Sequence, residues 1–195
     1  MNAARRACRT PVITACAILL ASCAAHPDRF YGLSTLPGAA LPPAAGYATR
    51  ILLSTSIPSV VDRRELIVDA PDDRILVLEH ERWAAPLSDL VNQTLARDIE
   101  QRRADVLVAD RAFDQAGIKP VRIKVEIVRM SARRGGQATM EAHWRIEDAA
   151  AQLDLLGGAS FSAPIEGDDY ASIARAFSLC LASLADRLAE KLPSR

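Results

Sequence analysis

Two stretches of alternating apolar and polar residues place the tightest constraint on the fold of this chain. Residues 121–127 and 138–146 carry an apolar side chain at every second position, with charged or polar residues between them. Because the side chains of a strand point alternately to its two faces, each stretch predicts a half-buried β-strand. Arg133-Arg134-Gly135-Gly136 lies between them and predicts a tight turn, since glycine tolerates positive φ. Together they predict an antiparallel hairpin.

A third stretch extends this hairpin into a meander. Residues 152–163 predict a further strand, which we expect to be interrupted at Gly157-Gly158. On the second strand, Trp144 falls on the apolar face, so we expect its ring to lie in the core. His143 falls on the polar face.

Two segments have helical periodicity instead. Five apolar residues recur at helical spacing after Pro86: Leu87, Leu90, Val91, Leu95 and Ile99. Pro86 suits the first turn, where its missing N–H costs nothing, and the helix should fray near Arg102-Arg103. A second apolar stripe consists of Ile173, Phe177, Leu181, Leu184 and Leu188. Asp168 or Asp169 would cap that helix, Pro193 marks its end, and Cys180 beside the stripe is expected to be a buried small hydrophobe.

The remaining elements are short strands and one spacer. Strands are predicted at residues 30–34, 47–54, 66–68, 75–78 and 105–110, with the third and fourth paired around the turn Ala70-Pro71-Asp72-Asp73. Residues 36–46 contain three prolines and two glycines and predict a loop or extended spacer. The chain therefore predicts a single-domain α+β fold: a mixed β-sheet with an antiparallel meander, covered by two long helices.

The first 22 residues predict an export signal. Residues 1–10 hold three arginines and no acidic residue, and residues 12–21 are almost wholly apolar. This run is too short to cross a bilayer, so it predicts a secretory signal peptide. Leu20-Ala21-Ser22-Cys23 resembles a bacterial lipobox, in which the cysteine thiol receives a diacylglyceryl group before cleavage and the new amine is usually acylated too. We therefore expect Cys23 to be the lipidation site, residues 23–29 a lipidated tether, and residues 30–195 the domain.

Plain secretion with an incidental cysteine is the alternative reading of this leader. Arg5-Arg6 also suggests twin-arginine export, but nothing else of that motif follows. Cys8 and Cys16 lie within the leader and are removed under any of these readings.

Composition of the mature chain limits its partners. Removing residues 1–22 leaves 173 residues and takes away three of the 24 basic residues but none of the 24 acidic ones, so the formal charge is near −3. No basic block exists, which makes nucleic acid an unexpected partner. Only Cys23 and Cys180 remain, and a lipidated Cys23 cannot pair, so no intramolecular disulfide is expected. Lipid chains on Cys23 would tether the domain to a membrane without spanning it.

Catalytic and metal-binding patterns are not found in the sequence. There is no HExxH, paired-cysteine, Gly-x-Ser-x-Gly or phosphate-binding glycine motif, so we expect no enzyme activity, no metal and no cofactor. The three histidines, His26, His80 and His143, are far apart. Glu79-His80-Glu81 could in principle ligate a cation, but we interpret it as a solvated strand end. Asp72-Asp73 is read as a turn.

One ordered series of motifs resembles a known family. Pro58, Asp62-Arg63, two apolar runs around a polar turn and Arg82-Trp83-Ala84-Ala85-Pro86-Leu87 at the start of a helix follow one another in residues 57–103. This series is similar to that of the ABC-type transport auxiliary lipoproteins, a family that includes PqiC, and Phe30-Tyr31-Gly32-Leu33 resembles the family's aromatic start. Phe30, Val61 and Ala85 depart from the pattern, and Ala85 replaces a glutamate. We interpret Trp83 and Pro86 as structural, a ring filling the strand-to-helix corner and a proline fixing the start of the helix.

The resemblance implies a non-enzymatic role in lipid transport. Family members are partners of MCE-domain proteins, which form tunnels fed by an inner-membrane permease or ATPase. A PqiC-like member sits at the outer membrane, facing the periplasm, and meets the far end of its tunnel as a ring of subunits. Ala24 after the anchor cysteine is compatible with sorting outward. The alternative function is a lipid-anchored periplasmic scaffold or assembly factor with no part in lipid transport.

Overall fold

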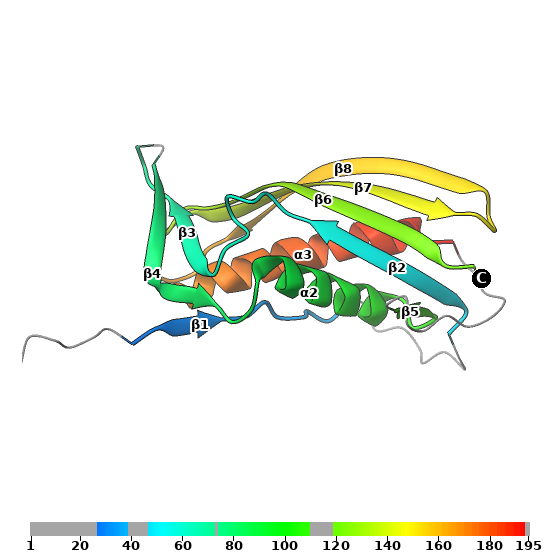
Figure 1. Ribbon diagram of the computed structural model, residues 1–195, viewed down its shortest axis with the longest axis horizontal. Helices are drawn as coiled ribbons and strands as arrows, with labels where there is room; N and C mark the ends of the chain where they lie inside the picture. The colour runs from blue at the N-terminus through cyan, green and yellow to red at the C-terminus, as the bar shows by residue number, and fades with distance from the viewer. Residues whose placement is uncertain (1–26, 39–46, 73, 110–118, 194–195) are drawn as a thin grey trace, which may run out of the picture.

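The computed structural model describes residues 27–38, 47–72, 74–109 and 119–193, which fold as one α+β domain (Figure 1). In this part of the chain, no helix is both long and apolar enough to cross a membrane. The strands are β1 (Arg29–Tyr31), β2 (Thr49–Ser56), β3 (Glu65–Asp69), β4 (Ile75–Trp83), β5 (Val106–Val108), β6 (Val121–Ala132), β7 (Gln137–Asp148) and β8 (Leu153–Pro164). The helices are α2 (Leu87–Arg102) and α3 (Ala171–Lys191).

The larger sheet has the strand order β5-β2-β6-β7-β8, and its last three strands form the expected antiparallel meander. Val125 pairs with Trp144, and Trp144 pairs with Gly157. The prediction that the third strand breaks at Gly157-Gly158 is wrong, because β8 runs through both glycines in unbroken register with β7. Gly157 is needed where it stands, since a Cβ there would come within 2.5 Å of the Trp144 indole.

The other half of this sheet is parallel. β2 pairs in parallel with β5 on one side and with β6 on the other. A parallel neighbour needs a long crossover, and α2 supplies it between β2 and β5 while packing on both strands. The expectation of a mixed sheet is therefore confirmed.

A smaller sheet with the order β1-β4-β3 stands at one end of the molecule (Figure 1). β3 and β4 are antiparallel around the predicted turn, and β1 adds to β4 in parallel over Glu81–Trp83 only. This hairpin projects beyond the ends of the helices.

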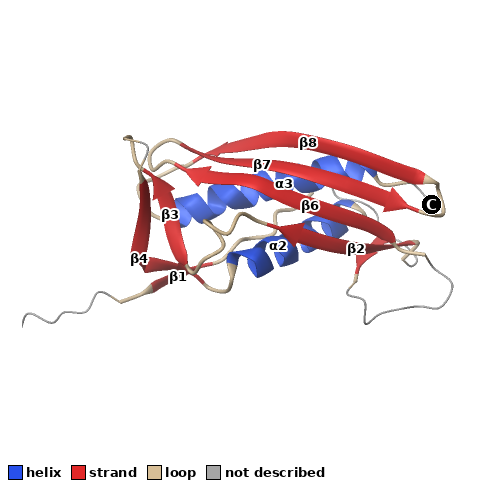
Figure 2. Cartoon of the chain, turned by 45° about the horizontal axis from the view of Figure 1, so that its top comes forward, coloured by secondary structure: helices blue, strands red, loops and turns tan. Residues whose placement is uncertain are grey.

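Both helices cover the same face of the larger sheet (Figure 2). α2 packs on β2 and β5, α3 packs on β7 and β8, and the helices pack on each other. The stripes predicted from helical spacing face inward, as do the apolar positions of β6 and β7, including Trp144. The opposite face of the sheet is open and polar.

The starts of the two helices differ slightly from prediction. Pro86 is the N-cap of α2 rather than a residue of its first turn. The N-cap of α3 is Tyr170, whose side chain makes no capping hydrogen bond. Asp169, one residue earlier, accepts a hydrogen bond of 2.8 Å from the Ser172 N–H, so it still satisfies a free donor of the first turn.

Candidate interaction site

The segment that follows the predicted tether is bound tightly to the body. β1 pairs with β4, and the Ala84 N–H donates to the Tyr31 carbonyl at 2.8 Å. Glu81 of β4 is 5% exposed, accepts a hydrogen bond of 2.5 Å from the Tyr31 hydroxyl and lies 3.2 Å from an Arg29 guanidinium nitrogen. Burial, together with the hydrogen bond to Glu81, raises the pKa of Tyr31 to about 12. We call these contacts between β1 and β4 the anchor seam.

The seam extends by one residue towards the N-terminus. Asp28 lies 3.1 Å from His80 Nδ1 and 3.3 Å from Arg82 Nε. The interpretation of Glu79-His80-Glu81 as a solvated strand end is therefore wrong for Glu81, which is buried against β1. The available sequence signal was that Glu81 lies two residues before Trp83 and so shares its face of β4. It was missed because a carboxylate is expected to be exposed, and the partners that allow its burial come from β1.

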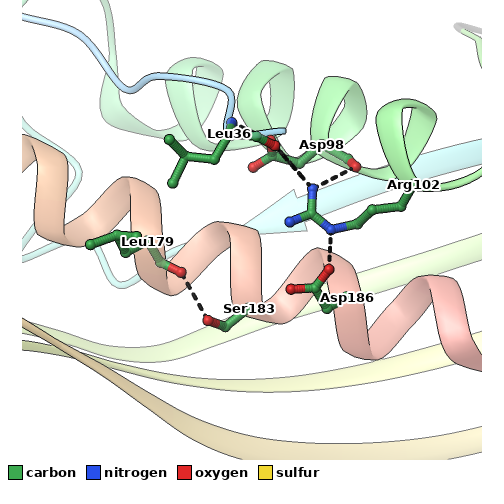
Figure 3. A network of polar contacts seen from close by, with 6 residues as sticks. All are labelled: Leu36, Asp98, Arg102, Leu179, Ser183 and Asp186. Atoms are coloured by element: carbon green, nitrogen blue, oxygen red, sulfur yellow. Dashed lines mark hydrogen bonds and ion pairs between the residues drawn. The ribbon is translucent and has the colours of Figure 1, made fainter. Parts of the chain in front are cut away.

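Beyond β1, the chain runs beside both helices and is held by a second carboxylate (Figure 3). The Ser34 N–H donates to Ser178 Oγ of α3 at 3.0 Å, and the Leu36 N–H donates to Asp98 Oδ1 of α2 at 2.9 Å. Arg102 joins the three segments, because its guanidinium donates to the carbonyls of Leu36 and Asp98 and to the carboxylate of Asp186 on α3.

Asp98 is fully buried at the centre of this network. Burial raises its pKa, while the Leu36 N–H and the Arg102 charge oppose that shift. Its Oδ2 has no hydrogen-bond partner among the described residues. The i,i+4 spacing of Asp98 and Arg102 was the available sequence signal, but on its own it indicates a surface ion pair.

Trp83 lies where β4 turns into α2 and is 3% exposed. It belongs to the same apolar cluster as Leu87, Phe177 and Val61. Its interpretation as a core residue at the strand-to-helix corner is confirmed. Cys180 is also buried as expected, and burial raises the pKa of its thiol to about 11, so it is an unreactive core residue.

The outer part of the small sheet carries an exposed apolar run. Ile75, Leu76 and Val77 of β4 are 52%, 42% and 41% exposed. We call the β3–β4 hairpin the hairpin arm. Consecutive residues of a strand point to opposite faces of its sheet, so this run exposes apolar side chains on both faces. Such exposure is typical of a contact surface.

The outer face of the large sheet holds an open groove of about 840 Å³. Its charged and polar lining includes Lys124, Glu126, His143 and Arg145. Arg145 is paired with Asp154 at 2.6 Å and with Glu147 at 3.1 Å. Such ion pairs are typical of the solvated face of a sheet.

Several features singled out in the sequence lie outside the described part of the chain. They are the leader with Cys8 and Cys16, the predicted lipidation site Cys23 with Ala24 and His26, most of the spacer at 36–46, and Asp73 of the predicted turn. Among the residues that are described, no group of three histidine, cysteine, aspartate or glutamate side chains is placed to hold a metal ion. His80 and His143 are on different sheets, as expected from their separation in sequence.

Comparison with known proteins identifies the family. The model of the ABC-type transport auxiliary lipoprotein component family matches residues 31–189, which run from the anchor seam to the last turns of α3. The chain belongs to this family. No curated protein sequence matches this auxiliary lipoprotein.

Two solved structures share the fold of this auxiliary lipoprotein. The crystal structure of an uncharacterized protein has a TM-score of 0.71 and 12% identity, and the match covers 86% of this chain and 100% of that one. A protein from Xanthomonas campestris has a TM-score of 0.59 and 18% identity, with 84% and 91% of the two chains covered. At these identities the likeness shows the fold alone.

Proposed function

We propose that this auxiliary lipoprotein is a non-enzymatic, lipid-anchored subunit of an MCE-type intermembrane lipid transport system. In this proposal Cys23 carries the lipid, the domain faces the periplasm at the outer membrane, and it docks as a homo-oligomer on the end of an MCE tunnel. The tunnel is fed by an inner-membrane permease and ATPase. Support comes from membership of the family, from the lipobox and from Ala24, which is compatible with sorting outward.

The observation that carries the proposal is the anchor seam. Arg29, six residues after Cys23, is already paired with Glu81 in β4. An extended chain spans at most ~3.5 Å per residue, so the seam would lie within roughly 20 Å of the lipidated cysteine. A domain held this closely stays at the membrane surface at high effective concentration, where weak contacts to a tunnel suffice.

A homo-oligomer of such subunits would be cyclic. All lipid anchors must enter the same membrane, so the subunits share one orientation and are related by an axis perpendicular to it. Head-to-tail contacts close into a ring under that symmetry, and a ring fits the end of a tunnel.

Photo-crosslinking in intact cells tests this function. A photoreactive amino acid is placed singly at exposed positions of the full-length lipoprotein, and crosslinked partners are identified by mass spectrometry. Recovery of an MCE-domain protein from some positions supports the proposal. Recovery of other envelope proteins without any MCE protein, across the whole exposed surface, would instead favour the scaffold or assembly factor.

A further inference from the structure

The outer edge of β8 lacks the features that normally protect an edge strand from pairing with another chain. Among the described strands, β8 pairs only with β7, so its outer row of backbone groups is open. Its last charged residue is Asp154, and residues 155–164 carry no charge at all. Natural edge strands of this length normally carry lysine, proline or a bulge that prevents pairing with another chain. β8 has no charge or bulge in this stretch, and its one proline, Pro164, stands at the end of the strand.

The side chains of β8 are also incompletely covered. Leu153, Leu155 and Phe161 point to the helix side but are only partly buried, whereas the facing positions on β7 are nearly inaccessible. Leu156, on the other face, is 75% exposed. β8 therefore offers apolar side chains on both faces together with free backbone hydrogen-bonding groups.

A second open edge belongs to the hairpin arm. β1 reaches only as far as Glu81, so residues 75–78 of β4 have β3 on one side and no described strand on the other. The run Ile75-Leu76-Val77-Leu78 is uncharged and largely exposed. The two edges lie apart, since β8 follows one long side of the molecule and β4 stands at one end (Figures 1 and 2).

We propose that the hairpin arm of one copy packs along the β8 edge of the next copy, head to tail. This deepens the homo-oligomer of the proposed function and rests on it. The two surfaces have the same chemistry, an uncharged strand with free backbone groups and apolar side chains. Residues 155–162 of β8 extend about 27 Å, which is long enough to pair with the uncharged run of residues 75–78, about 13 Å long.

A second copy accounts for both edges, whereas an unrelated protein would cover one of them. The two surfaces differ, so contact between them is heterologous, and it closes into a ring if the rotation permits. In a closed ring each arm and each β8 edge has a partner, so neither of these two edges is left open for aggregation. Such a ring is compatible with lipid anchors that all enter the same membrane.

Paired cysteines in the full-length lipoprotein, expressed in a Gram-negative host, test the contact. Val77→Cys and Ser160→Cys are combined in one chain, and cells are treated with a mild oxidant before non-reducing electrophoresis. The pair is expected to give a ladder of dimers and higher species. The two single variants and the pair Val77→Cys with Ser54→Cys, on distant β2, should give no ladder. Background is low because Cys180 is buried.

A charge on the edge provides the second measurement. Leu156→Lys is expected to lower the molar mass of the detergent-purified lipoprotein in light scattering, while Leu179→Lys on the exposed side of α3 leaves it unchanged. Both leucines are exposed, so neither change threatens folding. This contact is overturned if the molar mass of the oligomer is unchanged by Leu156→Lys and the Val77→Cys, Ser160→Cys pair gives no ladder. That result leaves the proposed function standing. A monomer at every concentration overturns the contact and the homo-oligomer together.

Discussion

The hydroxyl of Tyr31 donates a hydrogen bond of 2.5 Å to Oε2 of Glu81, a carboxylate that is almost wholly buried. These residues are 50 positions apart in the chain, and their contact fixes the first strand beside the fourth. The N-terminal segment is thus a built-in strand of the domain.

Tyr31→Phe is expected to lower the free energy of unfolding by ~1 kcal/mol at neutral pH, because Glu81 loses one of its two described partners. The pKa of Tyr31 is raised to about 12 in the folded state, above its ordinary value of 10.0. Its contribution is therefore fully present below pH 10 and is lost as the pH rises towards 12. Denaturant unfolding over this range should show that loss in the wild type and its absence in Tyr31→Phe.

Tyr47 supplies the matched control for that substitution. It is 63% exposed, so Tyr47→Phe should leave both the stability and the pH profile of the wild type intact. Equal profiles for Tyr31→Phe and the wild type would show that the hydroxyl contributes nothing to the seam.

Asp98→Ala is expected to lower the free energy of unfolding by ~2–3 kcal/mol, because it leaves the Leu36 N–H without its acceptor and removes a partner of buried Arg102. Asp98→Asn should cost less, because the amide oxygen still accepts from Leu36 and burial already disfavours the carboxylate charge. Denaturant unfolding of residues 24–195 measures both, with Gln93→Ala on the exposed side of α2 as control. The reverse ranking would mean that the charge itself stabilises the network.

Trp83→Ala should lower stability by ~3–5 kcal/mol, the range for truncation of a large buried aromatic side chain. Thermal melts of residues 24–195 test this, and Phe30→Ala is the control because Phe30 is 59% exposed. An unchanged melting temperature for Trp83→Ala, with loss of partner binding, would make Trp83 an interface residue.

Gly157→Ala is expected to destabilise the domain by ~1–3 kcal/mol, because the new Cβ would overlap the Trp144 indole and force the ring or β8 to move. Gly32→Ala places its Cβ where no heavy atom lies within 4 Å and should be tolerated. The melting temperatures of the two variants measure this difference. Equal tolerance would show that the Trp144 ring repacks freely.

Cys23→Ser is expected to abolish lipidation and to leave either a precursor held by its leader or an unanchored periplasmic product. Metabolic labelling with a clickable fatty acid reports the modification directly. Cys180→Ser should retain full labelling, since the Cys180 thiol is buried in the core. Equal labelling of Cys23→Ser and wild type would exclude Cys23 as the acyl acceptor.

Local periodicity determined the meander of β6, β7 and β8, both helices and their buried stripes. Alternation and helical spacing act between near neighbours, so they can be read from the chain itself. The one error in the meander, a break at Gly157-Gly158, arose because the reason for glycine lies across the sheet, in the indole of Trp144.

Tertiary structure alone decided the parallel pairing of β2, the separate small sheet and the burial of Glu81 and Asp98. Each depends on segments far apart in sequence, as when β1 covers β4 or Leu36 reaches α2. From sequence alone, a charged residue is predicted to be exposed. It can be buried only where a distant segment supplies hydrogen bonds that replace those to water. The open edges of β4 and β8 have the same origin, because a strand's pattern predicts its faces but not its neighbours.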